Sequence, residues 1–142
     1  HRLSEMFLLQ IMKFGWEEVH EIAEELEHIK KDKFFDRMDE LMGFPTIDPH
    51  GSPIPDKNGS FNKPKYKRLS QMPAQSTTTV KALRDSSTDF LLFLNNKAIQ
   101  LNTKITINHI EGFDGSLTVS YDGNSDVVLG KSICDRILVD ET

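Results

Sequence analysis

The chain has 142 residues, of which 37% are hydrophobic and 27% charged, and its net charge is −5. This composition is typical of a soluble globular protein and excludes a disordered chain, and no apolar run approaches the roughly 18 residues of a membrane span. The single cysteine, Cys134, excludes an internal disulfide and a thiolate-rich metal site, and it indicates a reducing compartment. The acidic balance argues against direct nucleic-acid binding by these residues.

The first part of the chain predicts three helices. Apolar residues recur at helical spacing from the start to about Lys13, from about Glu17 to Ile29, and from Asp32 to Met42. The opening residues show no N-cap signal before this periodicity begins. We therefore expect the chain to start within a helix, as a fragment of a longer protein would.

The remainder of the chain, from residue 44 onward, predicts a loop followed by short strands. Residues 44–66 are rich in proline and glycine, which predicts a loop and a domain boundary. Alternating or β-branched stretches at 77–83, 104–110, 116–121 and 126–129 then predict short strands, with a short helix after Ser87. We therefore predict an α+β fold: a three-helix domain with a proline-rich loop at residues 1–66 and a small β-barrel at 67–142.

Histidines and acids gather on the first two predicted helices. Four of them fall within about 100° of arc on the second helix, and two lie four residues apart on the first. If these helices pack antiparallel, imidazoles and carboxylates from both converge, which suits a divalent transition metal. The absence of sulfur favours Mn²⁺ or Fe²⁺, with Zn²⁺, Co²⁺ and Ni²⁺ as alternatives in vitro. The residues are His20, Glu24, Glu27 and His28, with His1 and Glu5.

Other interpretations stay open at this point. Glutamate-rich helices usually carry their acids as a solvated face, and Asp48-Pro49-His50 by itself is an ordinary turn. The segment from His20 to Glu24 begins like a His-Glu-x-x-His hydrolase helix, but Glu24 stands where the second histidine is needed. The alternatives are a metal-dependent enzyme or metal-handling accessory protein, and an interaction module that binds no metal.

Three segments carry a resemblance to a known family: residues 19–28 (VHEIAEELEH), 36–45 (DRMDELMGFP) and 48–55 (DPHGSPIP). Together they resemble the metal-binding and dimerisation domain of the diphtheria-toxin-repressor and manganese-transport-regulator family. The opening residues HRLSE resemble the helix that follows the family's winged helix, and the β-rich part resembles its SH3-like, FeoA-type domain.

The resemblance implies a function. This chain would be the metal-sensing and dimerisation fragment of a cytoplasmic, Mn²⁺- or Fe²⁺-dependent transcriptional repressor that controls metal homeostasis. It would act as a homodimer, bind operator DNA through an N-terminal winged helix that is missing here, and have no enzymatic activity and no membrane segment.

The resemblance also implies two metal sites. A primary site, incomplete without the winged helix, would use His1, Glu24, Glu27 and His28. Glu24 stands where iron-type members have a cysteine, which favours Mn²⁺ without excluding Fe²⁺. Candidates for an ancillary site are Glu5, Asp48 and His50, an acid from the SH3-like domain (Asp85 or Asp89), and His20, which matches an ancillary ligand of iron-type members.

The dimer interface is expected on the apolar faces of the opening and third helices. The alternative is that these side chains form only the intramolecular core, since three short helices need one as well. The candidates are Phe7, Leu8, Ile11, Phe34, Phe35 and Met38.

Overall fold

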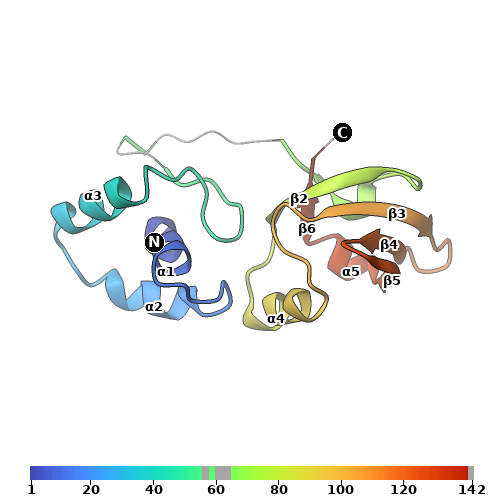
Figure 1. Ribbon diagram of the computed structural model, residues 1–142, viewed down its shortest axis with the longest axis horizontal. Coiled ribbons are helices and arrows are strands. Elements are labelled where there is room, and N and C mark those ends of the chain that lie inside the picture. Colours follow the sequence, from blue (N-terminus) through green and yellow to red (C-terminus); the bar gives the residue numbers. More distant parts are fainter. Residues whose placement is uncertain (56–57, 60–64, 141–142) are drawn as a thin grey trace. The chain divides into compact units, whose positions relative to one another are not determined.

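The computed structural model describes residues 1–55, 58–59 and 65–140, so the parts of the predicted loop at 56–57 and 60–64 lie outside the described residues. The chain divides into two compact units (Figure 1). One, here called the helical unit, comprises His1–Lys63 with Ser86–Leu92; the other, the sheet unit, comprises Pro64–Asp85 with Phe93–Thr142.

The helical unit begins with three helices, α1 (Arg2–Gln10), α2 (Val19–Leu26) and α3 (Asp32–Leu41). The apolar stripes of α1 and α2 meet in a small core centred on Leu8, Val19 and Ala23, because these side chains recur every three to four residues. Both helices end earlier than their apolar periodicity suggests. The partly buried side chains that complete this core are Leu9, Phe14, Ile22 and Leu26.

A tight loop follows α3. Ile47 and Pro53 form an isolated antiparallel bridge, and the Ile54 amide donates to the Thr46 carbonyl at 2.8 Å. The chain reverses between them at Gly51, whose φ of +85° is a conformation that a residue with a Cβ rarely adopts. These contacts close the loop around residues 48–50.

The sheet unit contains six antiparallel strands in the order β1-β6-β2-β3-β4-β5. In chain order, the elements from residue 65 onward are β1 (Lys67–Arg68), the 3-10 helix η1 (Leu69–Gln71), β2 (Thr77–Leu83), α4 (Thr88–Asn96), β3 (Lys104–Ile110), β4 (Leu117–Tyr121), β5 (Asn124–Leu129), α5 (Lys131–Cys134) and β6 (Ile137–Val139). The first part of α4, up to Leu92, belongs to the helical unit. Alternate side chains of the central strands are buried, including Val80, Ile105, Ile107 and Val119.

The predicted mixture of helices and antiparallel strands is therefore confirmed. The predicted barrel is not, because β1 and β5 are the edges of the sheet and no pairing joins them within residues 65–140. No helix in the described part of the chain is long and apolar enough to span a membrane.

Candidate metal centre

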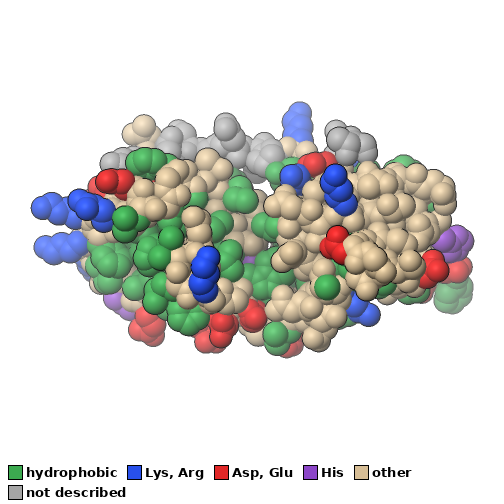
Figure 2. Space-filling model, viewed as in Figure 1, with side chains coloured by type: hydrophobic (Ala, Val, Ile, Leu, Met, Phe, Trp, Pro, Cys, Tyr) green, Lys and Arg blue, Asp and Glu red, His purple; other side chains and the backbone are tan. Residues whose placement is uncertain are grey.

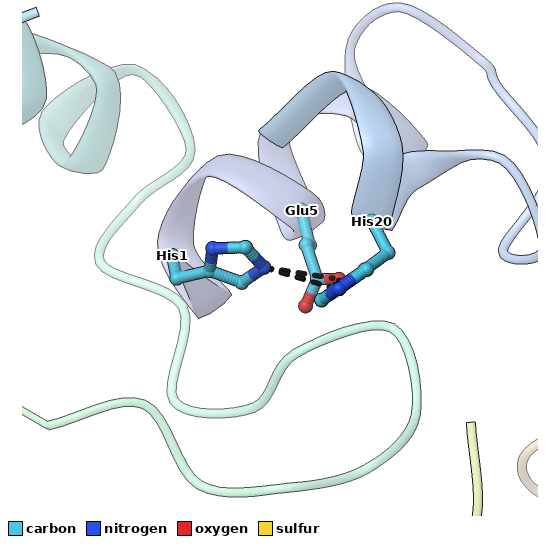
Figure 3. A group of neighbouring side chains, drawn as sticks. All are labelled: His1, Glu5 and His20. Atoms are coloured by element: carbon cyan, nitrogen blue, oxygen red, sulfur yellow. Dashed lines mark hydrogen bonds and ion pairs between the residues drawn. The ribbon is translucent and has the colours of Figure 1, made fainter. Parts of the chain in front are cut away.

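Packing of α1 against α2 brings three polar side chains to one point at the start of both helices. His1 is the residue just before the first turn of α1, Glu5 lies one turn further on, and His20 is the second residue of α2. Figure 3 shows the three side chains pointing toward one another from the two helices. The spacing of four residues between His1 and Glu5 puts both on one face, as the sequence predicted.

The facing atoms form a compact triangle. His1 Nε2 lies 3.1 Å from His20 Nδ1 and 3.8 Å from Glu5 Oε2, and His20 Nδ1 lies 3.3 Å from Glu5 Oε2. Donor atoms lie about 2.0–2.2 Å from a transition-metal ion, so two neighbouring donors on one ion are roughly 3.0–3.5 Å apart. The triangle thus has close to the dimensions of three ligands on a single ion.

The outer nitrogen of each imidazole faces a carboxylate. His1 Nδ1 lies 2.6 Å from Glu27 Oε1, and His20 Nε2 lies 3.1 Å from Glu24 Oε1. In the tautomer that donates the outer N–H to the carboxylate, each imidazole turns the lone pair of its inner nitrogen toward Glu5. Carboxylates are the usual partners of the second nitrogen in metal-binding histidines, where they fix the tautomer and the ring orientation.

Three acceptor atoms that converge in this way repel one another unless a positive charge lies among them. Either a proton on one imidazole or a metal cation supplies that charge. The donor set of two imidazoles and one carboxylate suits Mn²⁺, Fe²⁺ or Zn²⁺. The residues present therefore fit a divalent ion.

A second group of ligand atoms is formed by Glu5, Asp48 and His50. All three residues are buried, with exposed fractions of 4%, 4% and 5%. Asp48 Oδ1 accepts the backbone N–H groups of His50 and Ser52, both at 2.9 Å, which holds the loop closed. His50 Nε2 donates to the Trp16 carbonyl at 3.1 Å, and this leaves Nδ1 with its lone pair.

Glu5 belongs to both groups, and its electrostatic surroundings are unusual. Burial raises the pKa of its carboxyl group above the ordinary value, and the nearby Asp48 raises it further. His50 and the hydrogen bond with His20 act in the opposite direction. A buried carboxylate in such surroundings gains from an added cation.

The positively charged guanidinium of Arg2 lies beside Asp48. Arg2 Nε lies 3.8 Å from Asp48 Oδ2, and Arg2 Nη1 donates to the Pro53 carbonyl at 2.6 Å. Arg2 therefore ties the start of α1 to the loop. Sequence reasoning missed both Arg2 and the Trp16 carbonyl, because a guanidinium next to a histidine and a backbone atom carry no ligand signal.

The other predicted ligands lie outside the two groups of ligand atoms. Glu24 and Glu27 face the outer nitrogens of histidines, and exposed His28 belongs to neither group of ligand atoms found among the described residues. Asp85 is paired with Arg136, Nε to Oδ2 at 3.3 Å, and Asp89 is an exposed residue in the first turn of α4. Neither aspartate is part of the two groups.

The predicted interface residues divide into buried and exposed ones. Leu8 is 2% exposed within the α1–α2 core and Met38 is 4% exposed, so both support the fold of the helical unit itself. Phe7 and Phe35 are partly buried, whereas Ile11 and Phe34 are 47% and 39% exposed. Figure 2 shows hydrophobic side chains gathered over the helical unit. Its other exposed large apolar residues in residues 1–55 are Met12, Leu41, Phe44 and Ile47.

Both parts of the chain match models of known protein families. Residues 1–56 match the model of the iron dependent repressor metal binding and dimerisation domain, and residues 67–141 match that of the FeoA domain. A solved structure of a manganese-dependent transcriptional repressor is 34% identical, with a TM-score of 0.85 over 98% of this chain and 76% of that one. The chain belongs to the iron- and manganese-dependent repressor family.

Other relatives of this repressor family match over nearly the whole chain. The iron-dependent repressor IdeR of Mycobacterium tuberculosis is 26% identical over 99% of this chain, which spans 66% of that protein's length. A manganese-dependent repressor in complex with manganese is 33% identical, with a TM-score of 0.88 over 98% of this chain and 66% of that one. ScaR with bound Zn²⁺ is 30% identical, with a TM-score of 0.84 over 100% of this chain and 66% of that one. These relatives are repressors, so the prediction of a regulator family and not an enzyme family is confirmed.

Proposed function

We propose that this chain is the metal-sensing and dimerisation part of a transcriptional repressor activated by Mn²⁺ or Fe²⁺. The triangle formed by His1, Glu5 and His20 carries the proposal, because three acceptor atoms converge there at ligand spacing. Relatives described as bound to manganese or Zn²⁺ support the choice of a divalent transition metal. Such an ion supplies positive charge that draws acceptor atoms from different segments together.

Each candidate residue has a distinct part in this proposal. His1, Glu5 and His20 hold one ion, with Glu24 and Glu27 orienting the two imidazoles. Glu5, Asp48 and His50 tie the loop to α1. Following the family resemblance, we also propose a primary site that forms only when a winged helix supplies further ligands: Glu24 and Glu27 then turn from the imidazoles to bind an ion together with His1 and His28. Asp85 or Asp89 supplies an ancillary ligand.

Domain organisation is part of the same proposal. We place the metal-binding and dimerisation domain at residues 1–66 and an SH3-like domain of the FeoA type at 67–142. The two family models match on either side of this boundary. The strand order supports a small antiparallel fold of this kind, in which neighbouring strands of the sheet come from both ends of the unit.

The partners follow from the family. We propose that the protein forms a homodimer through the exposed apolar residues Ile11 and Phe34 and their neighbours, and that it binds operator DNA through a winged helix. A dimerisation domain and relatives that are repressors support both statements. A repressor of this kind works in the cytoplasm, where DNA and the metal pool are both accessible.

The experiment is a calorimetric titration of the chain with Mn²⁺ under anaerobic conditions. We expect saturable binding that is strongly weakened in His20→Ala. His109→Ala is the matched control, because His109 is an exposed histidine in the sheet unit and lies outside both ligand groups. Binding that is equal in all three proteins would overturn the assignment of His20, and the absence of binding in the unaltered chain would overturn the proposed function.

A further inference from the structure

A positively charged side chain, Arg2, holds the loop that follows α3 against the start of α1. Its guanidinium lies beside the buried carboxylate of Asp48 and donates to the Pro53 carbonyl. Asp48 also belongs to the group of ligand atoms that Glu5 and His50 complete. On the basis of the metal-sensing function proposed above, we propose that Arg2 is an internal competitor of the metal. Its charge takes the place of an ion beside Asp48 in the metal-free chain, and it must withdraw before an ion can bind there.

The two oxygens of Asp48 differ in their contacts. Oδ1 accepts the backbone N–H groups of His50 and Ser52, both at 2.9 Å, and so helps to close the loop. Oδ2 faces Arg2 Nε at 3.8 Å, a distance too long for a hydrogen bond, so the attraction between these two atoms is one of charge. Oδ2 is therefore the oxygen that an ion would bind, and the guanidinium of Arg2 lies beside it.

Burial explains why the metal-free chain needs a cation at this point. Glu5 and Asp48 are each 4% exposed, and two buried carboxylates in one group destabilise each other when no positive charge is near. Arg2 supplies one positive charge, and a divalent ion would bring two to the same oxygen. A guanidinium and an ion within a few ångströms of Oδ2 would repel each other strongly, because the carboxylate is shielded from solvent. The two cations therefore exclude each other.

The Arg2 side chain has room to withdraw. It is 45% exposed, whereas that of Asp48 is 6% exposed. A surface cavity of about 320 Å³ lies beside it, lined by His1, Arg2, Leu3, Ile54 and Pro55. Closure of the loop does not depend on Arg2, because the Ile54 amide donates to the Thr46 carbonyl and Asp48 Oδ1 accepts two amides. Withdrawal of Arg2 thus exchanges one tie between α1 and the loop for another.

Competition of this kind sets the metal concentration at which the loop group fills. Part of the binding free energy of the ion is used to displace Arg2, so the apparent Kd is higher than the ligands alone would give. Removing the arginine should therefore tighten metal binding. A residue that only held the loop in place would have the opposite effect, because its removal would leave the ligands less well positioned and weaken metal binding.

The test is the affinity of arginine variants for Mn²⁺, measured under anaerobic conditions by calorimetry and by tryptophan fluorescence. The chain has one tryptophan, Trp16, whose ring centroid lies 6.1 Å from that of His50, so its fluorescence reports on the loop group. We expect the Kd of Arg2→Gln to fall by about tenfold. Arg2→Lys keeps the charge, and Arg37→Gln removes the same charge from an exposed position of α3; both should bind Mn²⁺ as the unaltered chain does.

A double-mutant cycle shows whether the gain in affinity acts through Asp48. Asp48→Asn removes the charge of the carboxylate but keeps the oxygen that accepts the loop amides. In that background, Arg2→Gln should bring no gain in affinity. A second measurement needs no substitution: the exchange of the Arg2 guanidinium protons with solvent, followed by nuclear magnetic resonance. Arg2 Nη1 donates to the Pro53 carbonyl at 2.6 Å, so exchange should be slow without metal and fast with diamagnetic Zn²⁺ bound.

The outcomes separate this inference from the proposed function. A Kd that is unchanged or higher in folded Arg2→Gln, or an equal gain in Arg37→Gln, overturns the competition but leaves metal sensing in place. Guanidinium protons of Arg2 that stay protected when Zn²⁺ is bound have the same meaning, and this result does not depend on the folding of any variant. Absence of Mn²⁺ binding by the unaltered chain overturns the proposed function and the competition together.

Discussion

Replacing Glu5 by glutamine distinguishes two effects of the Glu5 carboxylate: its burial destabilises the metal-free protein, and its binding of an ion stabilises the metal-bound protein. Glu5 is 4% exposed, and burial raises the pKa of its carboxyl group, so the charged form destabilises the metal-free protein. Glutamine removes that charge while keeping the shape. The substitution weakens the hydrogen bond between the Glu5 carboxylate and His20, whose atoms lie 3.3 Å apart. We expect the free energy of unfolding of the metal-free variant to rise by about 1 kcal/mol.

Bound metal reverses the order of stability of the unaltered chain and the Glu5→Gln variant. An ion present at about one hundred times its Kd adds about 2.7 kcal/mol to the stability of a protein that binds it only when folded. At roughly 4 °C for each kcal/mol, this raises the Tm of the unaltered chain by about 10 °C. The Tm of Glu5→Gln should scarcely change at the same Mn²⁺ concentration, so the variant is the more stable form without metal and the less stable form with it.

The assay is thermal unfolding followed by circular dichroism, with chelator and then with Mn²⁺. Glu25→Gln carries the same change in charge at an exposed position of α2 and should behave like the unaltered chain. Two results would refute the reasoning. One is an equal rise in Tm with Mn²⁺ for Glu5→Gln, and the other is a metal-free variant that is markedly less stable.

Three further expectations concern packing and association. Leu8→Ala should lower the free energy of unfolding by about 3 kcal/mol, because Leu8 fills the α1–α2 core, whereas Leu41→Ala at a 66% exposed position should change it little. Phe34→Asp should shift the chain toward monomer in sedimentation velocity, because it places charge on the exposed apolar face; Phe113→Asp in the sheet unit is the control. The Cys134 thiol should react with a disulfide reagent at pH 8 orders of magnitude more slowly in the folded than in the unfolded chain, because burial raises its pKa to about 12.

For each of these three expectations, one result would contradict it. Equal stability of the two leucine variants would mean that Leu8 is not a core residue. A dimer that persists in Phe34→Asp would move the interface away from the N-terminal end of α3. Rapid labelling of Cys134 in the folded chain would mean that the sheet unit opens around α5 far more often than its packing suggests.

Much of the fold follows from residue patterns that act locally. The strands β2 and β3 span the stretches where β-branched residues and period-two alternation predicted them, at 77–83 and 104–110. Short elements were not predicted: β1 has two residues and β6 has three, and both depend on partners distant in the chain. Periodicity continues past Leu26 although α2 ends there, because an apolar pattern does not report where the backbone leaves the helix.

For the site, spacing predicted which side chains could meet but not which atoms would face one another. His1 and Glu5 share a face of α1 because they lie four residues apart, and His20 joins them through helix packing. Glu24 and Glu27 were expected to be direct ligands; in the structure their carboxylates face the outer nitrogens of the histidines. That distinction depends on side-chain rotamers and on Glu27 lying just beyond the end of α2, which a helical wheel does not represent.

The account rests on a metal ion among His1, Glu5 and His20, and anomalous diffraction from Mn²⁺-loaded crystals of the chain tests it most directly. We expect a manganese peak within about 2.0–2.3 Å of His1 Nε2, His20 Nδ1 and Glu5 Oε2. Ordered side chains at this point with no peak among them, and manganese bound at other residues, would contradict the account.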